Sequence, residues 1–505
     1  MCGRVKPRKL TVMTLPPSLP IPGALQTLLW IRKPVEFMGF WSQRYGSAYR
    51  LKLMAISLNL FSDPESIRAI FASKPDDMHA GETNRVLRAL VGEDSVLLLD
   101  GAAHLRRRKL LMPSFQGERM RLYGETMAEI TRNEIARLRV GEVVALHPHT
   151  QEITLQVILR TVFGADEGAE LTQLSVRIKR MLADAEYRIA FVILILLSAR
   201  PELEKNVIFK RILTARDRAD ELLYQTIAER RADPGAPQRK DVLATLLQAR
   251  DENGEKLTDR ELRDELMTAL AAGHETTATS LAWAVANLLT NPKSYAALRE
   301  EIAAAGGVSA TPEKLASLPY LDAVIKENLR LRPIVPVVGR MLKKPTKLGG
   351  YDLPAGSAVG ACIFLAHRNP EIYPNPDSFE PERFLGVPVD PVHWLPFGGG
   401  IRRCIGAQFA TYEMKVVLGT MLAHCDFALA QPTPVRTLRR AVTFFPEHGT
   451  RVKVLSNSAQ AGKTAAAASH SPAATNGHHE RPWASALSAL SALPAVQLLR
   501  RARAS

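Results

Sequence analysis

One cysteine follows directly after a glycine-rich loop, in the sequence Trp394-Leu-Pro-Phe-Gly-Gly-Gly-Ile-Arg-Arg-Cys404. Three consecutive glycines let the backbone approach something flat and bulky, because they carry no side chain that would collide with it. The sequence from Ile405 to Leu422 predicts a helix. A cysteine near a helix N-terminus faces unpaired N–H groups that favour thiolate over thiol. Cys404 is therefore a candidate metal ligand. The alternative is a buried free cysteine after a glycine turn.

A second group of polar residues lies in the middle of a predicted helix, Ala272-Gly273-His274-Glu275-Thr276-Thr277. A small pair, an acid and a hydroxyl are poor choices there for stability alone, since glycine costs about 1 kcal/mol relative to alanine. Glu275 and Thr276 are therefore candidate functional residues. The alternative is that Thr276 bonds back to a carbonyl one turn earlier.

Two further pairs have helical spacing. Glu327 and Arg330 are three residues apart, and His104 and Arg108 are four apart, so each pair shares one face of a helix. Taken alone, the first is a common surface ion pair and the second a solvated basic face.

The elements that must position these residues are mostly helical. The clearest helix opens at Thr258, where Thr258 and Glu261 have capping-box spacing, and Asn291-Pro292 stops it. Segments with a strand-like sequence are short, and they lie at Tyr45–Leu53 and on either side of Gly349-Gly350. We expect a mainly α protein with small β-sheets (α+β), with an irregular lead-in (1–30), a single catalytic domain (31–455) and a low-complexity C-terminal tail (456–505).

Composition limits the function classes. The 505 residues are 46% hydrophobic and carry a net charge of +15, but no zinc-knuckle spacing or long basic block favours nucleic acid. Four irregularly spaced cysteines indicate a reducing compartment. The longest apolar run, Ile189–Leu197, is far shorter than the roughly 20 residues of a spanning helix. We expect a cytoplasmic protein without a transmembrane anchor.

The spacing Phe397-x-x-Gly400-x-Arg402-x-Cys404-x-Gly406 resembles the heme-binding signature of the cytochrome P-450 family. The resemblance implies a triangular helical prism with heme b between the long central helix and the cysteine-loop helix. It implies Cys404 as the axial iron ligand, Phe397 packed near the sulfur and Arg402 paired with a heme propionate, with Gly400 and Gly406 completing the loop.

The other motifs follow in the order that the family has them. By resemblance, Glu275 and Thr276 deliver protons to bound dioxygen. Glu327 and Arg330, with Arg383 from the later stretch Phe379-Glu-Pro-Glu-Arg-Phe384, form a buried charge network behind the heme. The remaining assignments are contacts to the heme propionates, made by His104, Arg108 and Arg340.

The implied activity is that of a heme-thiolate monooxygenase, which inserts one atom of O2 into a fatty acid, terpenoid, steroid or drug-like molecule. Electrons from NAD(P)H would come through a ferredoxin or flavodoxin and its reductase to a monomeric enzyme. Basic residues that could form the docking face are Arg106, Arg107, Lys109 and Arg403. Apolar residues that could line the substrate pocket, or pack in the core, are Phe191, Leu194, Ile334, Val337 and Phe444.

Two alternatives remain on the sequence alone. A peroxide-driven peroxygenase or lipid-hydroperoxide isomerase would share the fold, although such relatives usually lose the acid-threonine pair that Glu275 and Thr276 provide. A heme-based sensor would need an output domain, for which the only candidate is the low-complexity tail.

Overall fold

The structure is a computed structural model of the 505-residue chain. It describes residues 15–53, 56–115, 123–164, 175–176 and 207–460. These residues belong to one compact unit that ends at Gln460, five residues beyond the predicted boundary.

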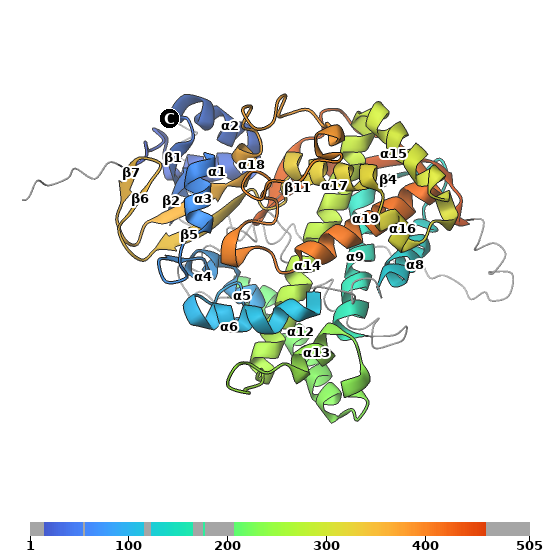
Figure 1. Cartoon of the computed structure of the whole chain (residues 1–505), viewed down its shortest axis with the longest axis horizontal. Coiled ribbons are helices and arrows are strands. Elements are labelled where there is room, and N and C mark those ends of the chain that lie inside the picture. Colours follow the sequence, from blue (N-terminus) through green and yellow to red (C-terminus); the bar gives the residue numbers. More distant parts are fainter. Residues whose placement is uncertain (1–14, 54–55, 116–122, 165–174, 177–206, 461–505) are drawn as a thin grey trace, which may run out of the picture. The chain divides into compact units, whose positions relative to one another are not determined.

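Helices dominate the described residues, as predicted (Figure 1). The α-helices are α1 (Gly23–Arg32), α2 (Pro34–Tyr45), α3 (Pro64–Phe71), α4 (Gly81–Asn84), α5 (Arg88–Val91), α6 (Gly101–Leu111), α8 (Gly124–Ile135), α9 (Leu146–Phe163), α12 (Val207–Ala232), α13 (Val242–Gln248), α14 (Asp259–Thr290), α15 (Pro292–Ala304), α16 (Pro312–Ala316), α17 (Pro319–Leu331), α18 (Ile363–Ala366) and α19 (Ala407–His424).

The β-sheets are small. One has the strand order β1 (Ala48–Leu53), β2 (Ile56–Phe61), β8 (Ala358–Cys362), β5 (Val337–Leu342) and β3 (Met78–His79). A second joins β4 (Val143–Ala145), β12 (Arg451–Asn457) and β9 (Cys425–Leu429), and two hairpins pair β6 (Thr346–Leu348) with β7 (Tyr351–Leu353) and β10 (Thr437–Arg440) with β11 (Thr443–Pro446). The strands expected beside Gly349-Gly350 are β6 and β7, so that prediction is confirmed.

The N-terminal lead-in is more ordered than predicted. Helix α1 lies mostly within the segment expected to be irregular, and its Trp30 is buried in a cluster with Phe37 and Trp41. The proline-rich stretch before α1 ends at Pro22, which is the N-cap of the helix. A proline just before or at the start of a helix does not interrupt it.

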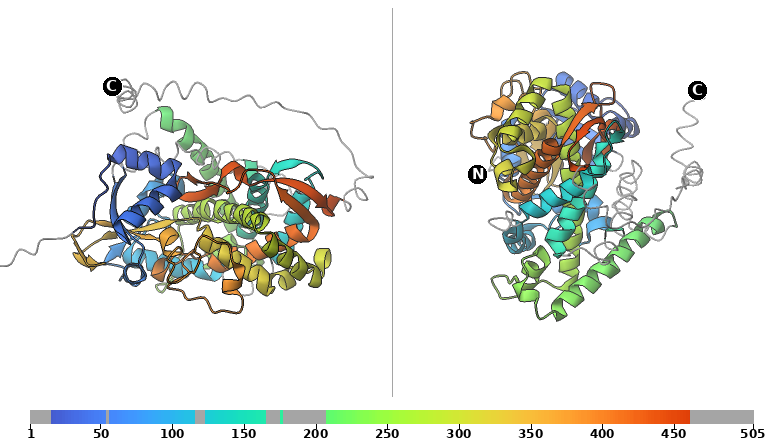
Figure 2. Two further views of the ribbon diagram at one scale, coloured as in Figure 1. Left: turned by 90° about the horizontal axis from the view of Figure 1, so that it is seen from above. Right: turned by 90° about the vertical axis from the view of Figure 1, so that its right-hand side faces the viewer.

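The long helix α14 forms the centre of the fold (Figure 2). Its capping box is present: the Thr258 side chain accepts from the Glu261 backbone, and the Glu261 side chain accepts from the Thr258 backbone. Its 32 residues give a length of roughly 48 Å. Most of the half from Thr277 to Leu288 is buried, in contact with α9, α17 and α19. The helix therefore fixes the position of Glu275 and Thr276 relative to the cysteine-loop helix.

Helix α9 packs closely against α14 near those residues. A Cβ atom on Gly273 would lie 2.3 Å from Ile158 Cδ1, so the glycine allows the close approach of the two helices. Thr150 and Thr154 of α9 donate to the carbonyls of Ala278 and His274 at 3.0 Å. The glycine that weakens α14 as an isolated helix therefore serves its packing.

Candidate functional site

The cysteine loop lies between the short helix η7 (Gly400–Arg402) and α19. The Cys404 N–H donates to the Phe397 carbonyl at 2.9 Å, and the Phe397 ring packs edge-on against Trp394. Gly400 has a φ of +62°, and a Cβ there would lie 1.9 Å from the Phe71 carbonyl oxygen. The loop can therefore take this path only with glycine at position 400.

Cys404 lies two residues before the N-cap of α19, Gly406, so the helix begins slightly later than predicted. The residue is exposed on one side, yet enough protein surrounds it for burial to raise the pKa of its thiol. A backbone hydrogen bond from Gly406 and the charges of Arg108 and Arg403 act in the opposite direction but are weaker. The helix start therefore does not ionise the thiol by itself. A bound metal ion would, because its charge stabilises the thiolate.

Cationic side chains gather on one side of this loop. Burial, followed by the charges of Arg402, Arg108 and Arg340, lowers the pKa of His104 to about 3. His104 Nδ1 is buried with no hydrogen-bond partner among the described residues. Burial and the charge of Arg402 also lower the pKa of Arg340 to about 10. Asp100 is the acid in contact with this group, and it accepts from Arg402.

This arrangement fits an anionic cofactor. Asp100 is already occupied by the backbone N–H groups of Ala80, Gly81 and Glu82, at 2.9 to 3.2 Å. Arg402 also donates to the carbonyls of Val96 and Leu99. The positive charges of Arg108 and Arg340 are not balanced by an acidic side chain of their own within the described residues. A cofactor that carries two carboxylates and accepts a sulfur ligand would supply the missing charge.

Glu275 and Thr276 point to different partners. Thr276 Oγ1 donates to the Ala272 carbonyl at 2.7 Å, which is the hydrogen bond to the preceding turn that the sequence left open as an alternative. The lone pairs of this hydroxyl oxygen can still accept a hydrogen bond. The Glu275 carboxylate instead faces α9, where Gln151 Nε2 donates to its Oε2 at 2.6 Å and His147 Nε2 lies 3.4 Å from its Oε1. Sequence reasoning missed both α9 residues, because they are more than a hundred positions away and belong to no motif.

The structure brings Glu327, Arg330 and Arg383 together in the interior. Arg330 donates to both carboxylate oxygens of Glu327, at 2.6 and 2.8 Å, and Arg383 Nε donates to Glu327 at 3.2 Å. Arg330 also donates to the carbonyls of the segment 367–378, at 2.7 to 3.0 Å. The network therefore links α17 to the irregular chain that leads to the cysteine loop.

The candidate pocket residues mostly pack in the core. Phe444 is buried against Phe364, with ring centroids 5.5 Å apart, and Ile334 is buried beside Trp283. Val337 packs partly buried in the same cluster as Phe444. These contacts favour the core-packing alternative for the three. Phe191 and Leu194 lie outside the described residues.

The predicted docking face needs a correction. Arg107 is only 3% exposed and forms ion pairs with Glu261 and Glu265 of α14, so it cannot contact a partner protein. Arg106 pairs with Asp251, and Lys109 with Glu252. Arg403 is exposed. The cluster in the sequence therefore does not form one free basic surface.

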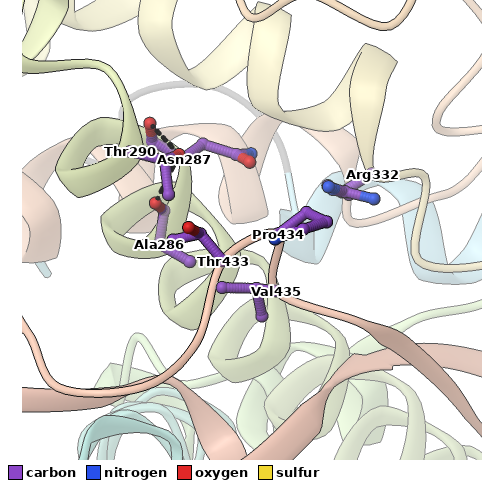
Figure 3. Close-up of a pocket in the computed structure, with 7 residues that line it drawn as sticks. All are labelled: Ala286, Asn287, Thr290, Arg332, Thr433, Pro434 and Val435. Atoms are coloured by element: carbon purple, nitrogen blue, oxygen red, sulfur yellow. Dashed lines mark hydrogen bonds between the residues drawn. The ribbon is translucent and has the colours of Figure 1, made fainter.

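A separate pocket of about 210 Å³ lies at the C-terminal end of α14 (Figure 3). It is lined by Ala286, Asn287, Thr290, Arg332, Thr433, Pro434 and Val435. Ala286 is eleven residues beyond Glu275, roughly 16 Å along the helix. Its cation, Arg332, stacks on Trp283 at 4.5 Å and donates to Thr437 at 3.2 Å. The pocket is therefore distinct from the site around Glu275 and Thr276.

None of the helices in the described ranges combines the length and apolar character that a membrane crossing requires.

Comparison with known proteins gives one consistent answer. Residues 14–454 match the protein family described as Cytochrome P450. Cytochrome P450 135B1 of Mycobacterium tuberculosis is 40% identical over 444 residues, covering 88% of this chain and 92% of that protein. Cytochrome P450 135A1 of the same organism is 36% identical over 446 residues, covering 87% and 95%.

A solved structure agrees with the sequence relatives. The retinoic acid-bound cyanobacterial CYP120A1 superposes with a TM-score of 0.75 at 26% identity, covering 88% of this chain and all of that one. The helix-rich fold with small sheets accords with these matches. The chain therefore belongs to the cytochrome P-450 family, as a bacterial-type heme-thiolate monooxygenase.

Proposed function

We propose that Cys404 is the axial thiolate ligand of heme b, and that the two heme propionates are held by His104, Arg108, Arg340 and Arg402. The observation that carries the proposal is the concentration of positive charge from Arg108, Arg340 and Arg402 beside the Cys404 loop, next to a buried His104 Nδ1 that has no hydrogen-bond partner among the described residues. Phe397, Gly400 and Gly406 shape the loop around the sulfur. When bound, the heme supplies the redox and oxygen chemistry, and thiolate ligation favours O–O cleavage.

We propose that Glu275 and Thr276 move the protons that this chemistry consumes. Glu275 lies in a hydrogen-bonded, largely buried position in mid-helix, and Thr276 carries the neighbouring hydroxyl. The charge network of Glu327, Arg330 and Arg383 has a structural role, since removing one partner would leave a buried charge unpaired at a cost of about 3–5 kcal/mol.

The proposed substrate is a hydrophobic organic molecule of the fatty acid, terpenoid, steroid or drug-like class. The family supports this class, and a structural neighbour is described as bound to retinoic acid, a molecule of that kind. Electrons would come from NAD(P)H through a ferredoxin or flavodoxin with its reductase. We further propose a monomeric, cytoplasmic enzyme whose single catalytic domain is followed by a separate C-terminal tail.

The test of the ligand assignment is the absorption spectrum of the reduced, carbon monoxide-bound protein. Wild type should show the red-shifted Soret band of thiolate ligation, and Cys404→Ser should lose it. Cys425→Ser is the matched control, because Cys425 is a buried free cysteine on β9 and should not affect the band. A band that persists in Cys404→Ser would place the ligand elsewhere.

Turnover then separates the alternatives. Product formation with O2, NADPH and a ferredoxin with its reductase supports the monooxygenase. Product with hydrogen peroxide alone, and none with the reductase, would instead support the peroxygenase. Dioxygen binding without product from a broad panel of hydrophobic compounds would support the sensor.

A further inference from the structure

The Glu275 carboxylate belongs to a small polar cluster between α9, α14 and the β10–β11 hairpin. Its Oε1 lies 3.4 Å from His147 Nε2 and accepts from Thr279 Oγ1 at 3.3 Å, while Thr279 Oγ1 is 3.1 Å from the same His147 nitrogen. Gln151 Nε2 holds Oε2 at 2.6 Å. His147 and Gln151 are one turn apart on α9, so one face of that helix contacts both oxygens of the Glu275 carboxylate.

The ring of His147 is fixed in place. The residue is 2% exposed, and its ring packs edge-on against Phe445 with centroids 4.6 Å apart. A Cβ on Gly449 would lie 3.2 Å from His147 Cβ, so the backbone before β12 closes the other side. The nitrogen Nε2 therefore stays directed at Glu275 and Thr279.

The charges that face this pair come from three elements. On α14, His274 is buried with Nδ1 3.2 Å from the Leu270 carbonyl. On β10, Arg440 Nη1 lies 3.9 Å from Glu275 Oε1. In the turn before β12, His448 is exposed. Glu275 is thus an acid surrounded by basic groups.

These surroundings determine the state of the carboxyl group. Burial alone would raise the pKa of Glu275, but the hydrogen bond and the charge of His147 outweigh it and lower that pKa to about 2. Near neutral pH the Glu275 carboxylate therefore holds no proton of its own. If it is to donate one, a neighbour must supply it, and the imidazole of His147, with Nε2 3.4 Å from Oε1, is in position to do so.

We propose that His147 is a positioning residue for Glu275 that also shares its proton with it, so that the pair, and not the carboxyl group alone, delivers protons toward Thr276. The inference rests on the proposed role of Glu275 and Thr276. In the transfer, the His147 Nε2–H bond breaks and an O–H bond forms on Glu275 Oε1. The pair is neutral overall before and after this step, and water restores the proton once it has moved on.

The decisive variant is His147→Gln, whose amide can still donate a hydrogen bond to Glu275 but cannot titrate. The readout is the ratio of hydrogen peroxide released to oxygen consumed during NADPH oxidation with a ferredoxin and its reductase, using dodecanoic acid as the probe. We expect the ratio to rise about threefold or more, because undelivered protons leave oxygen reduction incomplete.

His149→Gln is the matched control, because His149 lies two residues away on α9 and pairs with Glu134 of α8 instead. It should match wild type in the ratio. If His147→Gln also matches wild type, the proton-sharing role is wrong. If His147→Gln matches wild type while His147→Phe raises the ratio, the histidine only positions Glu275, which equally overturns the proposal of proton sharing.

A measurement independent of turnover uses the midpoint of thermal unfolding. At pH 7.5, His147→Phe and Glu275→Gln should lower Tm non-additively, because each removes the contact between these two side chains; additive shifts would contradict the contact. Failure of the proposed function is distinguishable, since wild type itself would then lack the thiolate Soret band. Failure of this inference alone leaves that band intact in all variants.

Discussion

Two glycines of the cysteine loop, both required by the family signature, differ in the space around them. Gly400 combines a φ of +62° with a neighbouring backbone oxygen that lies where a side chain would begin. Gly406, the N-cap of α19, has a φ of −83° and open space within 4 Å of its Cβ position. The first glycine is thus required by the fold of the loop itself. The second, Gly406, leaves open space near Cys404, and this space matters only when a cofactor occupies it.

We predict that Gly400→Ala destabilises the protein by about 2 kcal/mol or more, since a left-handed φ alone costs roughly 1–2 kcal/mol for alanine and the clash adds to it. Gly406→Ala should change the unfolding free energy of the heme-free protein by less than about 1 kcal/mol. Denaturant unfolding measures both. Equal losses for the two substitutions would show that the close contact with Phe71 is not the cause.

At the scale of elements, α14 holds the chain segment that precedes α6. Asp264 accepts from the Asp94 backbone at 2.8 Å and Glu265 accepts from the Val96 backbone at 2.8 Å. Ser95 and Thr268 join their hydroxyls at 2.7 Å. Arg402 of the cysteine loop donates to carbonyls of the same segment, so residues 92–99 connect the central helix to the site.

Glu265 makes this connection sensitive to pH. Burial raises the pKa of Glu265 to about 7, although Arg107 opposes the shift. Because the folded protein binds this proton more tightly than the unfolded chain, the group's favourable contribution is present below about pH 4.5 and is lost as pH rises toward 7. Glu265→Gln mimics the protonated form at every pH.

We therefore predict that the unfolding free energy of wild type falls relative to Glu265→Gln by roughly 1–3 kcal/mol between pH 5 and pH 8. Denaturant unfolding at several pH values measures the difference. Glu261→Gln is a useful comparison, because the pKa of Glu261 is lowered, so its contribution changes only below about pH 4.5 and should stay nearly constant between pH 5 and pH 8. A difference that stays constant with pH would mean that Glu265 remains ionised throughout.

At the scale of the whole molecule, local patterns in the sequence predicted what depends on neighbours along the chain. The capping box of α14, the β6–β7 hairpin and the cysteine loop all lie within short segments whose residue types require that geometry. Contacts between distant segments could not be predicted in this way. The burial of Arg107 and the contact of His147 with Glu275 arise only because α6 and α9 pack on α14.

The C-terminal boundary of the domain also depends on contacts between distant segments, and it can be tested. Composition placed the end of the domain at Leu455, but β12 continues to Asn457, whose Nδ2 donates to the carbonyls of Ile135 and Leu138 at 2.8 Å. Gln460 Nε2 donates to the Leu138 carbonyl at 2.6 Å. These bonds satisfy the end of α8 and the turn that follows it, and nothing in the tail's composition reveals them.

We predict that a chain ending at Gln460 retains the unfolding midpoint and the carbon monoxide spectrum of the full protein, because the compact unit ends there. A chain ending at Leu455 should lose about 1–3 kcal/mol of stability, since buried carbonyls lose their partners and β12 loses its last residues. Thermal and denaturant unfolding of the two truncations give the comparison. If both truncations equal the full chain, water replaces the Asn457 contacts without cost; if both are equally destabilised, residues beyond Gln460 contribute to the fold.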